Sequence, residues 1–91
     1  MAVDGYYLNH RQEMLEFVPD SAKRIIDIGC AAGEFIRNLG NIYGREVWGV
    51  EPDKRAAKSA MKYAYKILNM DADRALQKLP NRYFDLSLIH I

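Results

Sequence analysis

Residues 27–35, with the sequence DIGCAAGEF, decide how this chain folds. They begin inside the β-branched run RIIDI of residues 24–28, which is typical of a strand that is buried on both faces. Glycines and other small residues follow, and residues 34–39 (EFIRNL) then repeat apolar side chains at helical spacing. This order predicts a strand, a tight glycine-containing turn and a helix that starts directly behind the turn.

Two further apolar runs come later in the chain. Residues 46–50 (EVWGV) and residues 66–70 (KILNM) are predicted to form strands, and residues 53–64 between them carry an alanine stripe opposite four cations. Pro52 and Asp53 suit the first turn of that helix, through the fixed φ of proline and the helix dipole. Strands that alternate with helices of this length indicate βαβ units and a parallel sheet. The expected fold class is therefore α/β, the N-terminal half of a doubly wound sheet.

The flanking segments extend this pattern. Residues 11–18 are predicted to form a helix beside the sheet, and residues 73–79 a second short helix that ends before Pro80. Residues 83–85 (YFD) are predicted to begin a fourth strand, which should pair with the first. We therefore expect about three parallel strands and the start of a fourth, with helices on their flanks.

The composition narrows the class of protein. The chain has 91 residues with a net charge of +1, 49% hydrophobic and 27% charged residues, which is ordinary for a soluble globular protein. This near-neutral charge gives no electrostatic reason to expect nucleic acid or an anionic membrane as partner. The single cysteine excludes an internal disulfide framework and a multi-cysteine metal site, so no metal is expected. No apolar run approaches the ~18 residues of a membrane span, and the N-terminus lacks a signal peptide's apolar stretch, so we expect a cytoplasmic protein.

Residues 86–91 (LSLIHI) have two possible origins. They read as an apolar strand, but CTGTCTCTTATACACATC, which encodes the same residues, resembles the transposon-end adapter of common DNA library preparations. Processing and adapter remnants are excluded from fold reasoning. We expect residues 86–91 to be an adapter-derived tail and residues 1–85 to be the truncated native part, with a genuine strand as the alternative.

The end of the first predicted strand indicates a ligand site. Gly29 permits a tight turn, and Gly33 lets the backbone at the helix start approach a ligand closely. Free N–H groups at that helix start favour a carboxylate or a phosphate. A dinucleotide fingerprint, G-x-G-x-x-G, would require glycine at two positions where the chain has Ala31 and Glu34. The spacing therefore weakens an NAD interpretation.

Acidic residues follow the other two predicted strands. Glu51 comes directly after residues 46–50, where a carboxylate can accept hydrogen bonds from both ribose hydroxyls of an adenosine and repels a 2′-phosphate. Asp71 follows the third run, where it can accept from an exocyclic amine such as adenine N6. Because the carboxyl ends of parallel strands meet at one edge, the three segments predict a site for an adenosine-containing ligand.

Three motifs together match a known family. Residues 27–33 (DIGCAAG), residues 49–53 (GVEPD) and residues 70–72 (MDA) resemble the glycine loop and the acidic strand ends of class I S-adenosylmethionine-dependent methyltransferases. The chain looks most like the small bacterial members that act on sugars, lipids or other small molecules. The resemblance covers nearly all of residues 5–85 and departs from the family at Ala31, where the family's D-x-G-x-G-x-G has glycine. It implies a Rossmann-like methyltransferase fold, of which this chain is the N-terminal half.

The resemblance also implies a cofactor, S-adenosyl-L-methionine, and a role for each matching residue. Asp27 would position the methionine amino group, Glu51 would hold the ribose, and Pro52 would touch the adenine. Asp71 and Ala72 would read the amine edge of the adenine, while the glycine loop lines the cofactor with its backbone. The cofactor-binding residues that the resemblance implies are Asp27, Gly29, Cys30, Ala31, Gly33, Glu51, Pro52, Asp71 and Ala72.

The implied reaction is the transfer of a methyl group to a small-molecule, sugar or lipid acceptor, by in-line displacement from a sulfonium. The general base and the acceptor-binding residues are expected outside this chain, so no catalytic residue is assigned here. Because an unpaired parallel edge and missing helices would leave apolar surface exposed, we expect the isolated chain to be poorly stable or to aggregate, and to have little activity.

Other interpretations stay open at this point. The chain can be a fragment of a nucleotide-binding (NAD-type) oxidoreductase, or a non-catalytic binding domain, and its oligomeric state is not indicated. Gly29 and Gly33 can be simple turn glycines, and Asp27 can be a cap of the turn. Cys30 is more often a small buried hydrophobe than a nucleophile.

Overall fold

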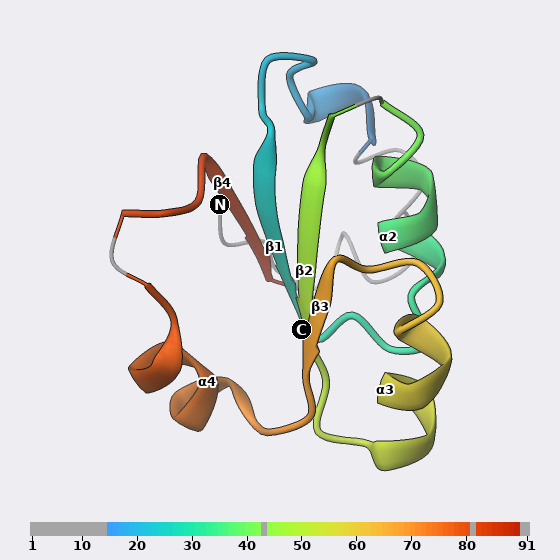
Figure 1. Ribbon diagram of the computed structural model, residues 1–91, viewed down its shortest axis with the longest axis vertical. Helices are drawn as coiled ribbons and strands as arrows, with labels where there is room; N and C mark the ends of the chain where they lie inside the picture. Colours follow the sequence, from blue (N-terminus) through green and yellow to red (C-terminus); the bar gives the residue numbers. More distant parts are fainter. Residues whose placement is uncertain (1–14, 43, 81, 90–91) are drawn as a thin grey trace.

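The computed structural model describes residues 15–42, 44–80 and 82–89. The strands are β1 (Arg24–Ile28), β2 (Glu46–Val50), β3 (Lys66–Leu68) and β4 (Leu86–Ile89). The helices are the 3₁₀ helix η2 (Leu15–Phe17) and the α-helices α2 (Glu34–Leu39), α3 (Lys54–Ala60) and α4 (Ala72–Lys78). All strands are parallel, in the order β3-β2-β1-β4 (Figure 1). This confirms the predicted α/β fold, the N-terminal portion of a Rossmann-like sheet.

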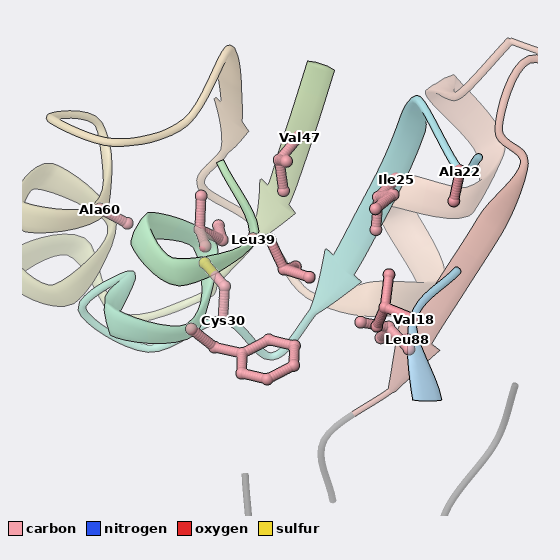
Figure 2. Close-up of a cluster of buried hydrophobic side chains, with 10 residues drawn as sticks. Val18, Ala22, Ile25, Cys30, Leu39, Val47, Ala60 and Leu88 are labelled. Atoms are coloured by element: carbon pink, nitrogen blue, oxygen red, sulfur yellow. The ribbon is translucent and has the colours of Figure 1, made fainter. Parts of the chain in front are cut away.

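Apolar side chains cover both faces of the sheet, which explains why the strand sequences are almost continuously apolar. On one face, α2 and α3 pack over a cluster that includes Ile25 of β1, Val47 of β2 and Leu88 of β4 (Figure 2). On the other face, Ile26 of β1 packs in a second cluster with Ala75 of α4. Figure 1 shows α4 on the opposite side of the sheet from α2 and α3. The helices therefore cover the faces and leave the strand ends at the two edges.

The fourth strand begins at Leu86, three residues after its predicted start. Tyr83 and Phe84 precede the ladder because their rings pack against the ring of Trp48, at centroid distances of 5.7 and 5.2 Å. This aromatic packing outweighs the β-propensity of the two residues. The aromatic residues at 83 and 84 therefore pack against Trp48 and do not form the first residue pairs of the strand.

Asp85 ends this segment by fastening it to the start of β1. Its Oδ2 accepts the backbone N–H groups of Lys23 and Arg24 at 2.8 and 2.9 Å. The backbone N–H of Asp85 in turn donates to the carbonyl of Arg24 at 2.7 Å. These bonds set the register in which Ile25 pairs with Leu86.

Strand β4 consists of residues from the predicted tail. It pairs in parallel with β1, which confirms the predicted neighbour of the fourth strand. The adapter origin of residues 86–91 stays a prediction, since an apolar segment of either origin can pair with a buried strand.

The predicted helix of residues 11–18 is only partly within the described residues, which begin at Leu15. There Leu15–Phe17 forms η2, and Val18 is buried in the cluster beneath α2. Helix α3 is shorter than predicted, since tighter turns follow Ala60. In the part of the chain that the structure describes, no helix has the length and apolar character that crossing a membrane requires.

Candidate cofactor-binding site

The carboxyl ends of β1, β2 and β3 bring the three predicted segments to one edge of the sheet. The strand ends are aligned, because Ile28 pairs with Val50 and Val50 pairs with Leu68. The segments that follow β1, β2 and β3 leave the sheet at its lower edge in Figure 1. Glu51 begins the segment after β2, and Asp71 lies in the segment after β3. The structure thus places the segments together as the parallel arrangement predicts.

The loop after β1 is anchored to β2 through its backbone. Gly29 and Cys30 donate their N–H groups to the carbonyl of Val50 at 2.8 and 3.1 Å. The loop then alternates left-handed positions, with φ of 81° at Gly29, 52° at Ala31 and 91° at Gly33. Its conformation is therefore fixed by hydrogen bonds within the protein as well as by its glycines.

Ala31 adopts the left-handed conformation although it carries a Cβ atom. Such a conformation costs about 1–2 kcal/mol in a residue other than glycine. The backbone N–H of Ala31 donates to Oε1 of Glu51 at 2.8 Å, a hydrogen bond to a charged acceptor. A bond of that kind contributes about 1.5–3 kcal/mol, so it can offset the strain at the position where the family has glycine.

Gly33 has a structural reason for lacking a side chain. It is the N-cap of α2, and a Cβ atom built there would lie 2.7 Å from the Cα of Ala60. The start of α2 can therefore pack against the end of α3 only because residue 33 is glycine. This packing is a reason within the protein, and the predicted approach of Gly33 to a ligand stays a prediction.

Asp27 and Cys30 are buried, with 0% and 1% of their surface exposed. The side chain of Cys30 lies in the cluster beneath α2, as Figure 2 shows, and not at the edge of the sheet. The N–H of Cys30 is bonded to Val50, and its carbonyl accepts the N–H of Gly33 at 3.1 Å. The geometry of Cys30 is that of a small buried hydrophobe, which leaves only its backbone near the edge.

Glu51 is half-buried and joins the glycine loop to the start of α3. Oε1 accepts the N–H of Ala31 at 2.8 Å, and Oε2 accepts the N–H of Asp53 at 3.0 Å. An ionised carboxylate has about four acceptor positions, two on each oxygen. Each oxygen therefore keeps capacity for one more donor, such as a ribose hydroxyl.

The residues beside Glu51 take part in the starts of two helices. Asp53 is the N-cap of α3, and Asp71 is the N-cap of α4, where its Oδ1 accepts the N–H of Arg74 at 2.9 Å. Pro52 is exposed next to Glu51, and Ala72 is the first residue of α4. The predicted contacts of Pro52, Asp71 and Ala72 with an adenine stay predictions, and the capping role of Asp71 is an addition to them.

Asn69 is the residue of this edge that the sequence analysis missed. Its side-chain Nδ2 donates to the backbone carbonyls of Glu51 and Pro52 at 2.9 and 3.0 Å. Its position could have identified it, because β3 ends at Leu68 and Asn69 is the first polar residue after the strand. Assigning residues 66–70 to a strand hid that position.

The edge carries both acidic and basic side chains. The acidic residues at the strand ends and in the helix starts that follow are Glu51, Asp53, Asp71 and Asp73, and the basic residues in the same helix starts are Lys54, Arg55 and Arg74. In the residues that the structure describes, no three histidine, cysteine, aspartate or glutamate side chains converge as metal ligands would. The free acceptor positions of the carboxylates suit a ligand that carries hydroxyls or an amine.

Solved methyltransferases share this fold. A methyltransferase from Archaeoglobus fulgidus, described as SAM dependent, is 26% identical with a TM-score of 0.68, over 92% of this chain and 42% of its own. The plantazolicin methyltransferase BamL, solved with a triazolic desmethylPZN analog and SAH, is 23% identical with a TM-score of 0.66, over 94% of this chain and 30% of its own. The plantazolicin methyltransferase BpumL, solved with a pentazolic analog and SAH, is 20% identical with a TM-score of 0.62, over 92% and 33%.

These matches bear out the resemblance to S-adenosylmethionine-dependent methyltransferases. This chain spans between 30% and 42% of the length of the solved methyltransferases that it matches. Comparison with curated protein sequences gives no match. The sequence model of the methionine biosynthesis protein MetW matches residues 9–90, nearly the whole chain, and the chain therefore belongs to the MetW family.

Proposed function

We propose that this chain is the cofactor-binding part of a cytoplasmic S-adenosylmethionine-dependent methyltransferase that acts on a small-molecule, sugar or lipid acceptor. The observation that carries the proposal is Glu51 at the end of β2, with its carboxylate turned to the glycine loop by the N–H of Ala31. A carboxylate in this place can hold the ribose of an adenosine, and the loop beside it lies at the same strand edge.

The residues at this edge fit the chemical groups of S-adenosylmethionine. Glu51 has acceptor capacity for ribose hydroxyls, and Asp71 lies at the neighbouring strand end. The residues proposed to hold it are Asp27, Gly29, Ala31, Gly33, Glu51, Pro52, Asp71 and Ala72, with Cys30 contributing through its backbone alone.

The bound cofactor would supply a methyl group on a positively charged sulfur, which is already activated for displacement. The residues of this chain would then orient and hold it: Glu51 fixes the ribose, and the loop after β1 limits how the rest can lie. Two plantazolicin methyltransferases solved with desmethylPZN analogs support an acceptor of the small-molecule class.

Binding of S-adenosylhomocysteine, measured by isothermal titration calorimetry, tests the proposal. We expect the chain to bind this product, and Glu51→Gln to weaken binding at least tenfold, about 1.4 kcal/mol, because the carboxylate loses its charge. Asp20→Asn is the control, since Asp20 is an exposed acid in the turn before β1, at the opposite ends of the strands. Binding of NADH without binding of S-adenosylhomocysteine would contradict the proposal and favour the oxidoreductase interpretation.

A further inference from the structure

Asn69 connects the ends of two neighbouring strands. It follows β3 directly, whereas Glu51 and Pro52 follow β2, and its Nδ2 donates to both of their carbonyls at 2.9 and 3.0 Å. A side-chain amide nitrogen carries two N–H groups, so these two carbonyls use the full donor capacity of Asn69. One exposed side chain therefore fixes two successive peptide carbonyls at the end of β2.

Glu51 is held through its whole length by this and other bonds. Its backbone N–H donates to the carbonyl of Leu68 at 3.0 Å, and its carbonyl accepts from Asn69. Its two carboxylate oxygens accept from Ala31 and Asp53. A continuous chain of hydrogen bonds thus runs from Asn69 after β3, through Glu51 after β2, to the loop after β1.

The segment that Asn69 holds has few other means of being held. Pro52 has no N–H group and cannot anchor the backbone by donating. The next donor along the chain, the N–H of Asp53, is already used by the carboxylate of Glu51. If the amide of Asn69 is removed, the carbonyls of Glu51 and Pro52 lose their donor, and on the backbone side Glu51 is then held only by the bond of its N–H to Leu68.

We propose that Asn69 is a positioning residue of the cofactor site, which sets the orientation of the Glu51 carboxylate towards the ribose hydroxyls and towards Ala31. The inference rests on the proposed function, because it assigns Glu51 to the ribose. Asn69 itself need not touch the cofactor, and its effect passes through the backbone of residues 51 and 52.

The first test needs no ligand. Amide hydrogen exchange by NMR is compared at Ala31 in the 91-residue chain, in Asn69→Ala and in Asn41→Ala. Asn41 is the matched control, because it is an exposed asparagine in the turn after α2, far along the chain from the strand ends of the site. We expect exchange at Ala31 to accelerate about tenfold in Asn69→Ala, since its acceptor is no longer held in place, and to stay unchanged in Asn41→Ala.

The second test measures discrimination between adenosine and 2′-deoxyadenosine by calorimetry. We expect the parent chain to prefer adenosine about tenfold, because Glu51 accepts from the 2′-hydroxyl, and Asn69→Ala to reduce this preference to about twofold or less. A ratio of two affinities cancels a general loss of stability, which would weaken both ligands alike. Asn69→Asp, which places a carboxylate against two carbonyls, should reduce the preference at least as far.

The outcomes separate this inference from the proposed function. If the parent chain binds neither nucleoside nor S-adenosylhomocysteine, the proposed function fails and the inference fails with it. If the parent chain prefers adenosine, and Asn69→Ala keeps both that preference and slow exchange at Ala31, only the role of Asn69 is overturned.

Discussion

The two edges of the sheet each present a glutamate of the β2 region, and they hold it in different ways. At the amino edge, Oε2 of Glu46 accepts from Nε1 of Trp48 at 2.7 Å and from the hydroxyl of Tyr83. At the carboxyl edge, Glu51 accepts from backbone N–H groups, with one bond on each oxygen. Glu46 thus joins rigid aromatic side chains to one another, whereas Glu51 joins loops and keeps acceptor capacity on both oxygens.

The two glutamates also differ in the residues that surround them. The guanidinium of Arg24 lies 4.5 Å from the centre of the Tyr83 ring, and Nζ of Lys66 lies 5.3 Å from that of Trp48. Cations and aromatic rings therefore surround Glu46, and these contacts stabilise the sheet. Around Glu51 the neighbours are left-handed loop residues and helix caps. The amino edge is thus held by side-chain contacts, whereas the carboxyl edge, where we propose that the cofactor binds, keeps free polar acceptors.

The largest difference between two variants is expected in the free energy of unfolding, when the left-handed glycines before α2 (Gly33) and before β2 (Gly44) are each replaced by alanine. Gly33→Ala combines a φ of 91° with a Cβ atom 2.7 Å from the Cα of Ala60, and we expect a loss of about 3 kcal/mol in the free energy of unfolding. Gly44→Ala has a φ of 82° and no atom within 4 Å of the new Cβ, so we expect a loss of about 1 kcal/mol. Urea denaturation measures both, and equal losses would show that Gly33 does not pack closely against Ala60.

Exchanging each glutamate for glutamine should separate stability from binding. We expect Glu46→Gln to lower the free energy of unfolding by about 1 kcal/mol and to leave the affinity for S-adenosylhomocysteine unchanged, since its partners lie at the other edge. Glu51→Gln should lower the affinity for S-adenosylhomocysteine, and this loss of binding free energy should be larger than the change in the free energy of unfolding. Denaturation and calorimetry on both variants check this, and a binding loss in Glu46→Gln would remove the distinction between the edges.

The amino edge should contribute to the pH dependence of stability. The N–H groups of Arg24 and Lys23 lower the pKa of Asp85, and the hydroxyl of Tyr83 lowers the pKa of Glu46. Carboxylates with a lowered pKa stabilise the fold above their unfolded pKa of about 4, and this contribution is lost as the pH falls through the folded pKa. The hydrogen bond to Glu46 raises the pKa of Tyr83, so its contribution is present below about pH 10 and is lost as the pH rises further.

Urea denaturation between about pH 2 and 7 should therefore show a fall in stability towards acid, and Asp85→Asn should reduce that fall. Asp53→Asn is the comparison at the carboxyl edge, since Asp53 is exposed there as the N-cap of α3. If stability falls as much towards low pH in Asp85→Asn as in the parent chain, the role of the bonds from Lys23 and Arg24 to Asp85 is contradicted.

Ala31→Gly should have the smallest effect. Glycine relieves about 1–2 kcal/mol of left-handed strain, but it enlarges the entropy of the unfolded chain by about 0.4–1 kcal/mol. We expect a net change within about 1 kcal/mol in unfolding and little change in binding, because Glu51 already holds this position. A large gain in affinity would mean that Ala31 distorts the loop.

The sequence was most informative where local pattern and burial agree. The bounds of β1 and β2 were predicted correctly, because both strands are buried on two faces and their apolar runs are continuous. The meeting of Glu51 and Asp71 at one edge followed from parallel pairing. The start of β4 was predicted too early, because Tyr83 and Phe84 have strand propensity but pack on Trp48. That contact joins residues far apart in the chain.

The hydrogen-bond partners of the site residues could not be predicted from the sequence, for a similar reason. That Ala31 donates to Glu51, and Asn69 to the carbonyls of Glu51 and Pro52, depends on side-chain directions at the ends of three strands. Periodicity fixes the face of a strand on which a residue lies, but not the hydrogen bonds made behind its end. Gly33 shows the same limit, because its contact with Ala60 joins two helices.

The bonds around Glu51 have a thermodynamic consequence for any ligand. Ordering a flexible loop when a ligand arrives costs about 1–2 kcal/mol for each residue whose backbone is fixed. The loop after β1 is tied to Val50 and Glu51 by hydrogen bonds within the protein, so we expect that entropy to be lost during folding and not during association. Binding at this edge should therefore involve small backbone movements and a modest entropic penalty, with affinity set by the new polar contacts themselves.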